Sequence, residues 1–142
     1  MAKKQATRTI LIIEDEPDIQ NFISRVLELE GYRVLRADEG KTGLKIVRED
    51  HVSLVLLDLR LPGPDGWSVL REMKQDTALA HIPVVVLTAI AESIQRRRTM
   101  RMGATQYLVK PLSANHLSTT VAGILSKKGS PGRIIPENIA SS

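Results

Sequence analysis

Five polar residues directly follow apolar, β-branched stretches, and their types suit the handling of metal ions and phosphate groups. They are Glu14, Asp15, Asp58, Thr88 and Lys110. Two carboxylates about 4 Å apart repel by roughly 4 kcal/mol at an effective dielectric constant near 20, more than the ~1 kcal/mol of a typical hydrogen bond. A cluster of the three acids therefore needs protonation, the Lys110 ammonium or a metal ion. Hard oxygen ligands without cysteine or clustered histidine favour Mg²⁺, with Mn²⁺ as the alternative.

This combination has the parts for phosphoryl transfer onto a carboxylate. Asp58 would be the nucleophile, while a metal ion and Lys110 would neutralise charge on the phosphoryl oxygens. The sequence has no Gly-x-x-x-x-Gly-Lys-Ser/Thr loop to hold a nucleotide. Each residue alone has a plainer interpretation, because acids after a strand cap the next helix and a lone threonine or lysine is usually solvated. Their shared position after four strands favours a site.

The elements that must position these residues alternate along the chain. Apolar runs predict buried strands, and segments with a helical period lie between them. Strands are predicted at 9–13, 33–37, 54–57, 83–87 and 105–109, and helices from Pro17 to before Gly31 and at 41–49, 67–75, 91–102 and 114–126. The alternation predicts an α/β fold, a doubly wound (βα)5 sheet of five parallel strands with helices on both faces. Ligands of such sheets bind at the carboxyl ends of the strands.

Length and composition agree with one soluble domain. The 142 residues are 42% hydrophobic and 25% charged, which suits a single core. The lack of cysteine favours a cytoplasmic location, and no apolar run is long enough for a membrane span. The net charge of +4 comes from the ends, a predicted basic arm at 1–8 and a predicted flexible tail at 127–142 around a domain at 9–126. Since aromatic residues are also scarce, we expect no direct nucleic acid binding.

Four segments together resemble the receiver domains of two-component response regulators. They are residues 13–16 (Ile-Glu-Asp-Glu), 57–66 (Leu-Asp-Leu-Arg-Leu-Pro-Gly-Pro-Asp-Gly), 87–89 (Leu-Thr-Ala) and 103–111 (Gly-Ala-Thr-Gln-Tyr-Leu-Val-Lys-Pro). Any one of them would carry little weight, but they follow the family's order and spacing. The resemblance implies a flavodoxin-like fold with strand order 2-1-3-4-5.

The resemblance also implies which residues hold the metal and accept the phosphoryl group. Asp58 corresponds to the phosphoacceptor. Asp15 and Asp58 would bind Mg²⁺ together with the backbone carbonyl of Arg60, and Glu14 would act mainly through water. Glu14 is a departure, because many relatives have aspartate there.

Further matching residues correspond to those that bind the phosphoryl group and respond to it. Lys110 would pair with the phosphoryl group, and the Thr88 hydroxyl and Ala89 amide would donate hydrogen bonds to it. Tyr107 corresponds to an aromatic switch that turns inward when Thr88 moves. The alternative is a half-buried strand tyrosine with a hydrated hydroxyl.

The loop after Asp58 and the bond before Pro111 correspond to shaping elements. Proline fixes φ and glycine permits positive φ, so the loop would be shaped by Pro62, Gly63, Pro64 and Gly66. Pro64 departs from the family, since many relatives have methionine there. The Lys110–Pro111 bond resembles one that is cis in the family and aims the lysine.

The function implied is a phosphorylation switch in a phosphorelay. A sensor histidine kinase or a phosphotransfer protein would supply the phosphoryl group. Phosphorylation would change binding to a downstream protein at the fourth helix, fifth strand and fifth helix. The only chemistry would be self-phosphorylation and autodephosphorylation, so the chain would not be an enzyme. The sequence extends sixteen residues beyond Ser126, which we interpret as a single-domain regulator, with a truncated chain and a homodimer as alternatives.

Two other functions and one basic surface stay open. An aspartate-nucleophile phosphohydrolase usually has a second acid two residues after the nucleophile, where this sequence has Arg60. A scaffold that binds partners without phosphorylation is the other alternative, and the intact set of site residues argues against it. The predicted fourth helix carries either a solvated basic face or a partner surface, formed by Arg96, Arg97, Arg98 and Arg101.

Overall fold

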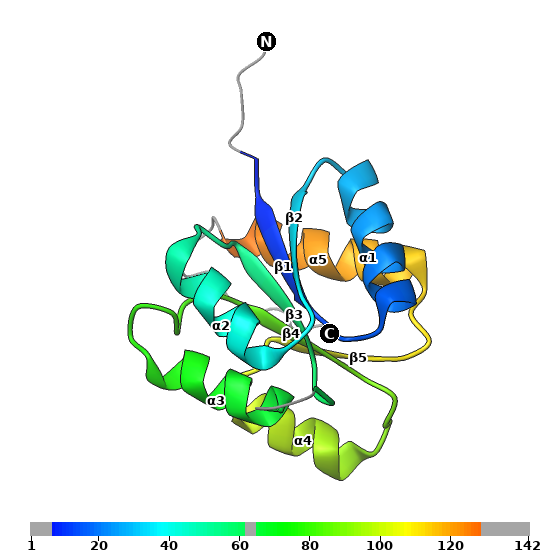
Figure 1. The fold of residues 1–142 in the computed structure, drawn as a ribbon. Coiled ribbons are helices and arrows are strands. Elements are labelled where there is room, and N and C mark those ends of the chain that lie inside the picture. The colour runs from blue at the N-terminus through cyan, green and yellow to red at the C-terminus, as the bar shows by residue number, and fades with distance from the viewer. Residues whose placement is uncertain (1–6, 62–64, 129–142) are drawn as a thin grey trace.

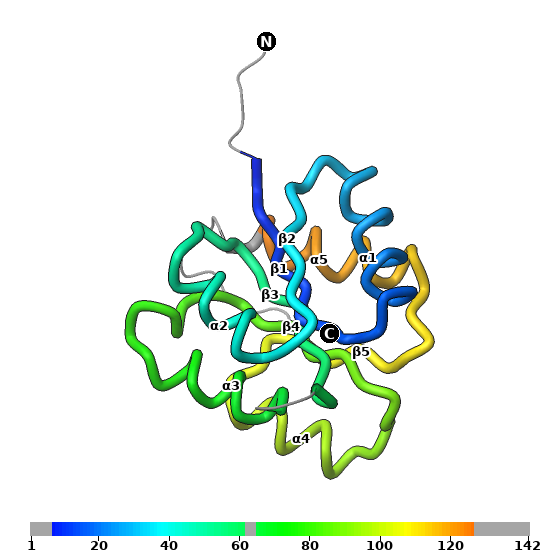
Figure 2. The backbone as a smooth tube through the Cα atoms, in the orientation of Figure 1, coloured from blue at the N-terminus to red at the C-terminus, as the bar shows by residue number. Residues whose placement is uncertain are grey.

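The computed structural model describes residues 7–61 and 65–128. Strands and helices alternate through this part of the chain (Figures 1 and 2). The strands are β1 (Thr9–Ile13), β2 (Arg33–Ala37), β3 (Leu54–Asp58), β4 (Val84–Thr88) and β5 (Gln106–Val109). The helices are α1 (Pro17–Leu29), α2 (Gly40–Glu49), α3 (Gly66–Gln75), α4 (Ser93–Arg101) and α5 (Ala114–Lys128). The predicted α/β class is confirmed.

The five strands form one parallel sheet in the order β2-β1-β3-β4-β5. This confirms the order 2-1-3-4-5. The chain reverses its direction of winding after β2, so β1 and β3 are neighbours at the point where a doubly wound sheet opens a crevice beyond its carboxyl edge. The register pairs Ile13 of β1 with Leu57 of β3, which places the next residues, Glu14 and Asp58, side by side at that edge.

Helices cover both faces of the sheet, and the sheet divides the core in two (Figure 1). Successive side chains of a strand point to opposite faces, so Leu11 and Ile13 face α2 and α3 while Ile10 and Ile12 face α1 and α5. The central strands β1, β3 and β4 are buried along their whole length. The polar residues at their ends are therefore held by rigid, fully packed segments.

The ends of the helices explain most of the small differences from the predicted boundaries. Pro17 is at the start of α1 and Gly31 follows its end with φ +95°, as predicted. Helix α4 is shorter than the predicted 91–102, because Glu92 is an extended N-cap and Gly103 ends the segment with φ +108°. Helix α5 continues to Lys128, two residues beyond its predicted end.

Parts of three predictions fall outside the described residues. These are residues 1–6 of the basic arm, the loop residues Pro62, Gly63 and Pro64, and residues 129–142 of the tail. Arg8, the last residue of the predicted arm, donates a hydrogen bond to the Leu125 carbonyl of α5 (Nη1···O 3.1 Å). No helix in the described ranges has the length and apolar character that crossing a bilayer requires.

Candidate metal centre

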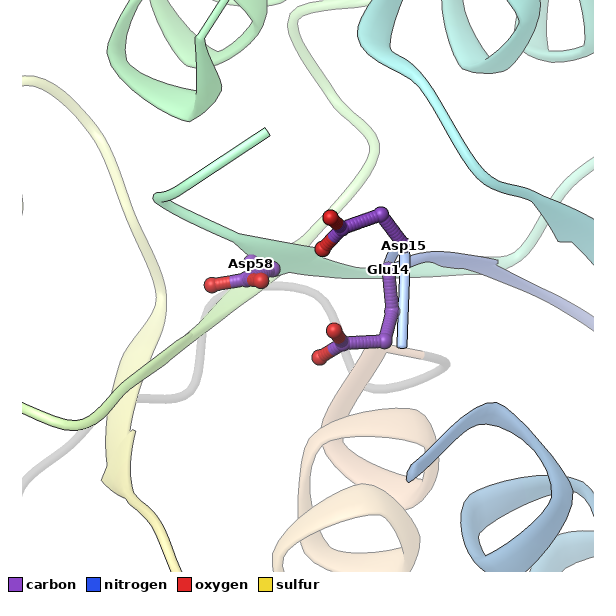
Figure 3. Close-up of side chains that lie close together, drawn as sticks. All are labelled: Glu14, Asp15 and Asp58. Atoms are coloured by element: carbon purple, nitrogen blue, oxygen red, sulfur yellow. The ribbon is translucent and has the colours of Figure 1, made fainter. Parts of the chain in front are cut away.

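Three carboxylates meet at the carboxyl edge of the sheet (Figure 3). Glu14 and Asp15 follow β1, and Asp58 is the last residue of β3. Each acid offers one oxygen, and these oxygens all lie within 4.8 Å of one another. Glu14 is 0% exposed and Asp58 is also buried, whereas Asp15 is exposed. The predicted cluster of these three acids is present, and the register between β1 and β3 brings them together.

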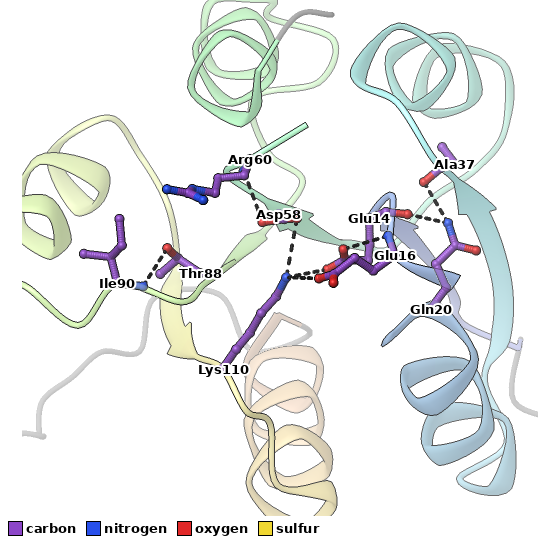
Figure 4. A network of polar contacts seen from close by, with 9 residues as sticks. All are labelled: Glu14, Glu16, Gln20, Ala37, Asp58, Arg60, Thr88, Ile90 and Lys110. Atoms are coloured by element: carbon purple, nitrogen blue, oxygen red, sulfur yellow. Dashed lines mark hydrogen bonds and ion pairs between the residues drawn. The ribbon is translucent and has the colours of Figure 1, made fainter. Parts of the chain in front are cut away.

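Lys110 is the cation that faces this cluster (Figure 4). Its Nζ lies 2.9 Å from Glu14 Oε1, 3.4 Å from Asp58 Oδ2 and 3.6 Å from Glu16 Oε1. Lys110 follows β5, and its backbone N–H donates to the carbonyl of Thr88 (2.8 Å). The Lys110–Pro111 bond is cis, as the resemblance implied. Glu14 thus approaches Asp58 from β1, on one side of β3, and Lys110 approaches it from β5, on the other side.

The titration of Glu14 and Lys110 reflects their burial and their contact. Burial raises the pKa of Glu14 above its ordinary value, against the hydrogen bonds from Lys110 and from the Glu16 backbone, which lower it. Burial by itself lowers the pKa of Lys110, but the hydrogen bond to Glu14 and the charges of Asp58 and Glu14 raise it by more. The Lys110 ammonium is therefore charged at neutral pH, whereas burial disfavours the ionised form of Glu14 even beside that ammonium.

The donor set fits a hard divalent cation. Three carboxyl groups share one ammonium in a partly buried site, and a divalent cation would add the positive charge that favours their ionised forms. Oxygen ligands match the preference of Mg²⁺, which keeps several waters and takes few carboxylates. Glu14, Asp15 and Asp58 could hold such an ion.

The backbone beside Asp58 leaves no space for a side chain at Gly66. Asp58 Oδ1 accepts a hydrogen bond from the Arg60 backbone N–H (3.1 Å), and Gly66 N–H donates to the Leu59 carbonyl (3.0 Å). A Cβ at Gly66 would lie 2.4 Å from Asp58 O and 2.5 Å from Leu59 Cα. The role predicted for Gly66, to supply a positive φ, is wrong, because the φ of Gly66 is not positive. Glycine is needed because the chain passes so close to the end of β3.

Thr88 and Tyr107 are linked through a residue of α4 that sequence reasoning missed. Gln95 Nε2 donates to Tyr107 Oη (2.7 Å) and to Thr88 Oγ1 (3.3 Å). Tyr107 is 3% exposed and its hydroxyl donates to the Ile90 carbonyl (2.6 Å), so it is not the half-buried tyrosine of the alternative. Ala89, which follows Thr88 in the loop before α4, is exposed.

Gln20 of α1 is a second residue that sequence reasoning missed. Its Nε2 donates to the backbone carbonyls of Glu14 and Ala37 (Figure 4), the second at 3.2 Å. The Glu14 backbone N–H also donates to the Ala37 carbonyl (3.0 Å). Gln20 thereby fixes the turn that carries the acids after β1. No pattern in the sequence distinguishes Gln20 from the other polar residues of α1.

Comparison with known proteins agrees with this geometry. The sequence model described as the response regulator receiver domain matches residues 10–122. The chain belongs to the response regulator receiver domain family. Receiver domains act in two-component signalling, bind Mg²⁺ at an acidic site and are generally not classical enzymes.

Relatives and solved structures resemble this receiver domain at moderate identity. The phosphate regulon transcriptional regulatory protein PhoB of Pseudomonas aeruginosa is 34% identical over 88% of this chain and 54% of its own length. The probable transcriptional regulator ycf27 of Porphyridium aerugineum is 32% identical over 91% of this chain and 53% of its own. The receiver domain thus spans about half the length of the curated relatives it matches.

Two solved structures cover almost the same extent as this receiver domain. A response regulator receiver domain protein from Clostridium thermocellum is 32% identical, with a TM-score of 0.78 over 86% of this chain and 97% of its own. The receiver domain of a sensor histidine kinase from Pseudomonas aeruginosa is 30% identical, with a TM-score of 0.78 over 85% of this chain and 99% of its own. That structure contains a magnesium ion coordinated in its active site cleft.

Proposed function

We propose that Asp58 accepts a phosphoryl group from the phosphohistidine of a sensor histidine kinase or phosphotransfer protein, and that this changes the affinity of the chain for a downstream protein. The observation that carries the proposal is the position of Lys110, whose Nζ lies within 3.4 Å of Asp58 and 2.9 Å of Glu14 at the metal-competent cluster. A surface ion pair would not need two buried acids around one lysine.

The proposed reaction exchanges one bond to phosphorus for another. An oxygen of Asp58 forms a bond to phosphorus as the bond from phosphorus to the histidine nitrogen breaks. The histidine nitrogen leaves with the bonding electrons and takes up a proton from solvent. The products are an aspartyl phosphate and a neutral histidine. Dephosphorylation transfers the same group to water, which regenerates the Asp58 carboxylate.

Asp15, Asp58 and the Arg60 carbonyl are the proposed metal ligands, with Glu14 acting through water. When bound, Mg²⁺ supplies positive charge that stabilises the phosphoryl oxygens. Glu14 and its hydrogen bond from Glu16 N (3.1 Å) keep the acidic turn in shape. The hydrogen bond from Arg60 N holds Asp58 Oδ1 and leaves Oδ2, on the lysine side, as the oxygen that attacks.

Three further groups are proposed to bind the transferred phosphoryl group. The Lys110 ammonium pairs with it, and the Thr88 hydroxyl and Ala89 backbone amide donate hydrogen bonds. In the β3–β4 register, Asp58 pairs with Leu87. Thr88 is the next residue of β4, so it lies one register position beyond the acceptor on the neighbouring strand. Preorganised donors of this kind stabilise charge that develops on the oxygens.

The proposed output face consists of α4, β5 and α5. Helix α4 is loosely packed, because Thr99 is its only buried residue. Arg96 of α4 lies over the ring of Tyr107 in β5, with 5.8 Å from Cζ to the centroid. A change at Tyr107 would therefore reach the exposed side of α4. Exposed apolar groups on this face, Met100 and Val109, suit a protein partner.

Phosphorylation tests the proposal directly. With acetyl phosphate and Mg²⁺, the wild-type chain should gain one phosphoryl group by intact-protein mass spectrometry, and Asp58→Asn should gain none. Asp38→Asn is the matched control, because Asp38 is an exposed acid after β2 at the same sheet edge but outside the cluster. A wild-type chain that stays unmodified under these conditions would favour the scaffold function instead.

A phosphohydrolase is separated from a switch by turnover. Arg60 occupies the position where such an enzyme has its second acid, and its backbone N–H is committed to Asp58. We therefore expect no sustained release of product from a chromogenic phosphate ester. The names of the longer relatives include transcriptional regulators, but direct binding of nucleic acid by this chain is not part of the proposal.

A further inference from the structure

Gln95 is the only residue of the described chain whose side chain bonds to both Thr88 and Tyr107. Its amide nitrogen carries two N–H groups, one for each acceptor. Because the Tyr107 hydroxyl gives its own proton to the Ile90 carbonyl, its oxygen needs a donor, and this fixes the orientation of the Gln95 amide. One planar group thus connects the end of β4 to β5.

The contacts of Thr88 explain what Gln95 does to its hydroxyl. Thr88 Oγ1 accepts from the Ile90 backbone N–H (3.1 Å) and from Gln95 Nε2 (3.3 Å). A hydroxyl has two acceptor lone pairs and one proton. With both lone pairs engaged, the hydroxyl proton is free to be donated elsewhere. Gln95 therefore favours Thr88 as a donor, the role that a phosphoryl group on Asp58 requires.

Gln95 is itself held by the helix that carries it. The Thr99 hydroxyl donates to the Gln95 carbonyl (2.8 Å), and Thr99 is the one buried residue of α4. Tyr107 is buried, with its hydroxyl against the Ile90 carbonyl. The hydrogen bond from Gln95 to Tyr107 (2.7 Å) is shorter than the one to Thr88 (3.3 Å). The main effect of Gln95 is therefore to retain the tyrosine in the inward position.

We propose that Gln95 is a positioning residue that holds Tyr107 inward and Thr88 ready to donate, and so couples phosphorylation of Asp58 to α4. This inference rests on the proposed function of Asp58. A chain in which the inward state is less populated binds a phosphoryl group more weakly, because the apparent affinity falls in proportion to the competent fraction. Loss of the amide therefore weakens binding at Asp58 through its effects on Thr88 and Tyr107.

The test measures the dissociation constant of beryllofluoride, a phosphoryl mimic, in the presence of Mg²⁺. Gln95→Leu keeps the approximate size and removes both hydrogen bonds, and we expect roughly fivefold to tenfold weaker binding, as for the loss of one net hydrogen bond. Gln95→Glu replaces the donor by an acceptor and should weaken binding at least as much. Gln75→Leu, at an exposed position of α3, should leave it unchanged.

A double-mutant cycle with Tyr107→Phe separates coupling from simple structural damage. If Gln95 acts through the tyrosine hydroxyl, the double variant binds clearly more tightly than the product of the two single effects predicts. With labelled tyrosine, the Tyr107 ring signal of Gln95→Leu should also show greater solvent relaxation before beryllofluoride is added, while Tyr32 is unchanged.

The outcomes distinguish this inference from the proposed function. A wild-type chain that binds no beryllofluoride would contradict the function of Asp58. Two results would overturn only the role of Gln95. One is a Gln95→Leu variant that binds beryllofluoride as tightly as the wild type. The other is a double variant whose loss of affinity equals the product of the two single losses. Thermal unfolding followed by circular dichroism verifies that each variant is folded before it is scored.

Discussion

The guanidinium of Arg98 lies over the indole ring of Trp67, with 4.4 Å from Cζ to the ring centroid. Trp67 belongs to α3, which follows the Asp58 loop, and Arg98 belongs to α4. A cation above an aromatic face is attracted to the electron density of the ring. The contact therefore joins the loosely packed α4 to a helix next to the acidic cluster. Since Trp67 is the only tryptophan, its fluorescence reports on this contact.

Arg98→Ala should lower the free energy of unfolding by about 0.5–1 kcal/mol, the range for an exposed cation–π contact. The measurement is urea denaturation followed by Trp67 fluorescence. Arg97→Ala is the control, because Arg97 is also exposed on α4 and lies over no aromatic ring of the described residues. Equal losses in the two variants would contradict a specific contribution from the contact.

Glu14→Gln should stabilise the chain at neutral pH in the absence of divalent ions. The folded pKa of Glu14 is raised above the unfolded value by burial. Glu14 therefore contributes stability that is complete below the unfolded pKa near 4.5 and is lost as pH rises through the folded pKa. The glutamine variant lacks this loss, so its stability should fall less than that of the wild type as pH rises through that window.

Mg²⁺ should reverse the order of these two proteins. An ion that binds only the folded state stabilises it, and more so the tighter it binds. The variant has one carboxylate fewer and should bind the ion more weakly. Thermal unfolding with and without MgCl2 at several pH values measures both effects. A wild type that is more stable than Glu14→Gln without divalent ions at neutral pH would contradict the assigned cost of the buried carboxylate.

Ser24→Ala should raise the free energy of unfolding by about 1 kcal/mol. Ser24 is 1% exposed in α1, and its hydroxyl has no hydrogen-bond partner in the described chain. Removing a buried hydroxyl of this kind removes its desolvation cost. Ser126→Ala is the control in α5, since Ser126 is exposed and gains the same helix propensity. Chemical denaturation should show the larger increase for Ser24→Ala.

Gly66→Ala should destabilise the chain by roughly 2 kcal/mol, as for overpacking of a rigid site, and slow phosphorylation by acetyl phosphate. The added Cβ would meet the backbone of Asp58 and Leu59, which cannot rotate away as a side chain would. Gly123→Ala is the matched control, because in the described chain no atom beyond its neighbours and its own stretch of helix backbone lies within 4 Å of its Cβ position in α5. Phosphorylation of Gly66→Ala at the wild-type rate would show that the end of β3 tolerates a shift.

Much of the fold was predictable because each signal was local. The apolar runs that became β1 and β2 have the predicted bounds, and Pro17 and Gly31 mark the two ends of α1. The acids were predictable as a group because parallel strands end at one edge. The boundaries of α4 were not, since its charged sequence shows little amphipathic pattern and its ends depend on Glu92 and Gly103.

The contacts around the cluster could not be predicted from local patterns. Gln20 and Gln95 look like ordinary polar residues of surface helices, and only the folded chain brings them to the carbonyl of Ala37 and the hydroxyl of Tyr107. The reason for glycine at position 66 also needed coordinates, because close approach of two backbone segments leaves no trace in the sequence.

The division of the core by the sheet has an evolutionary consequence. Tyr107 packs into the layer shared with α2 and α3, whereas its neighbour Leu108 packs with α1 and α5. Substitutions in one layer leave the side chains of the other layer in place. Random mutation can therefore alter the packing on one face of the sheet while the strand ends that carry Glu14 and Asp58 stay where they are.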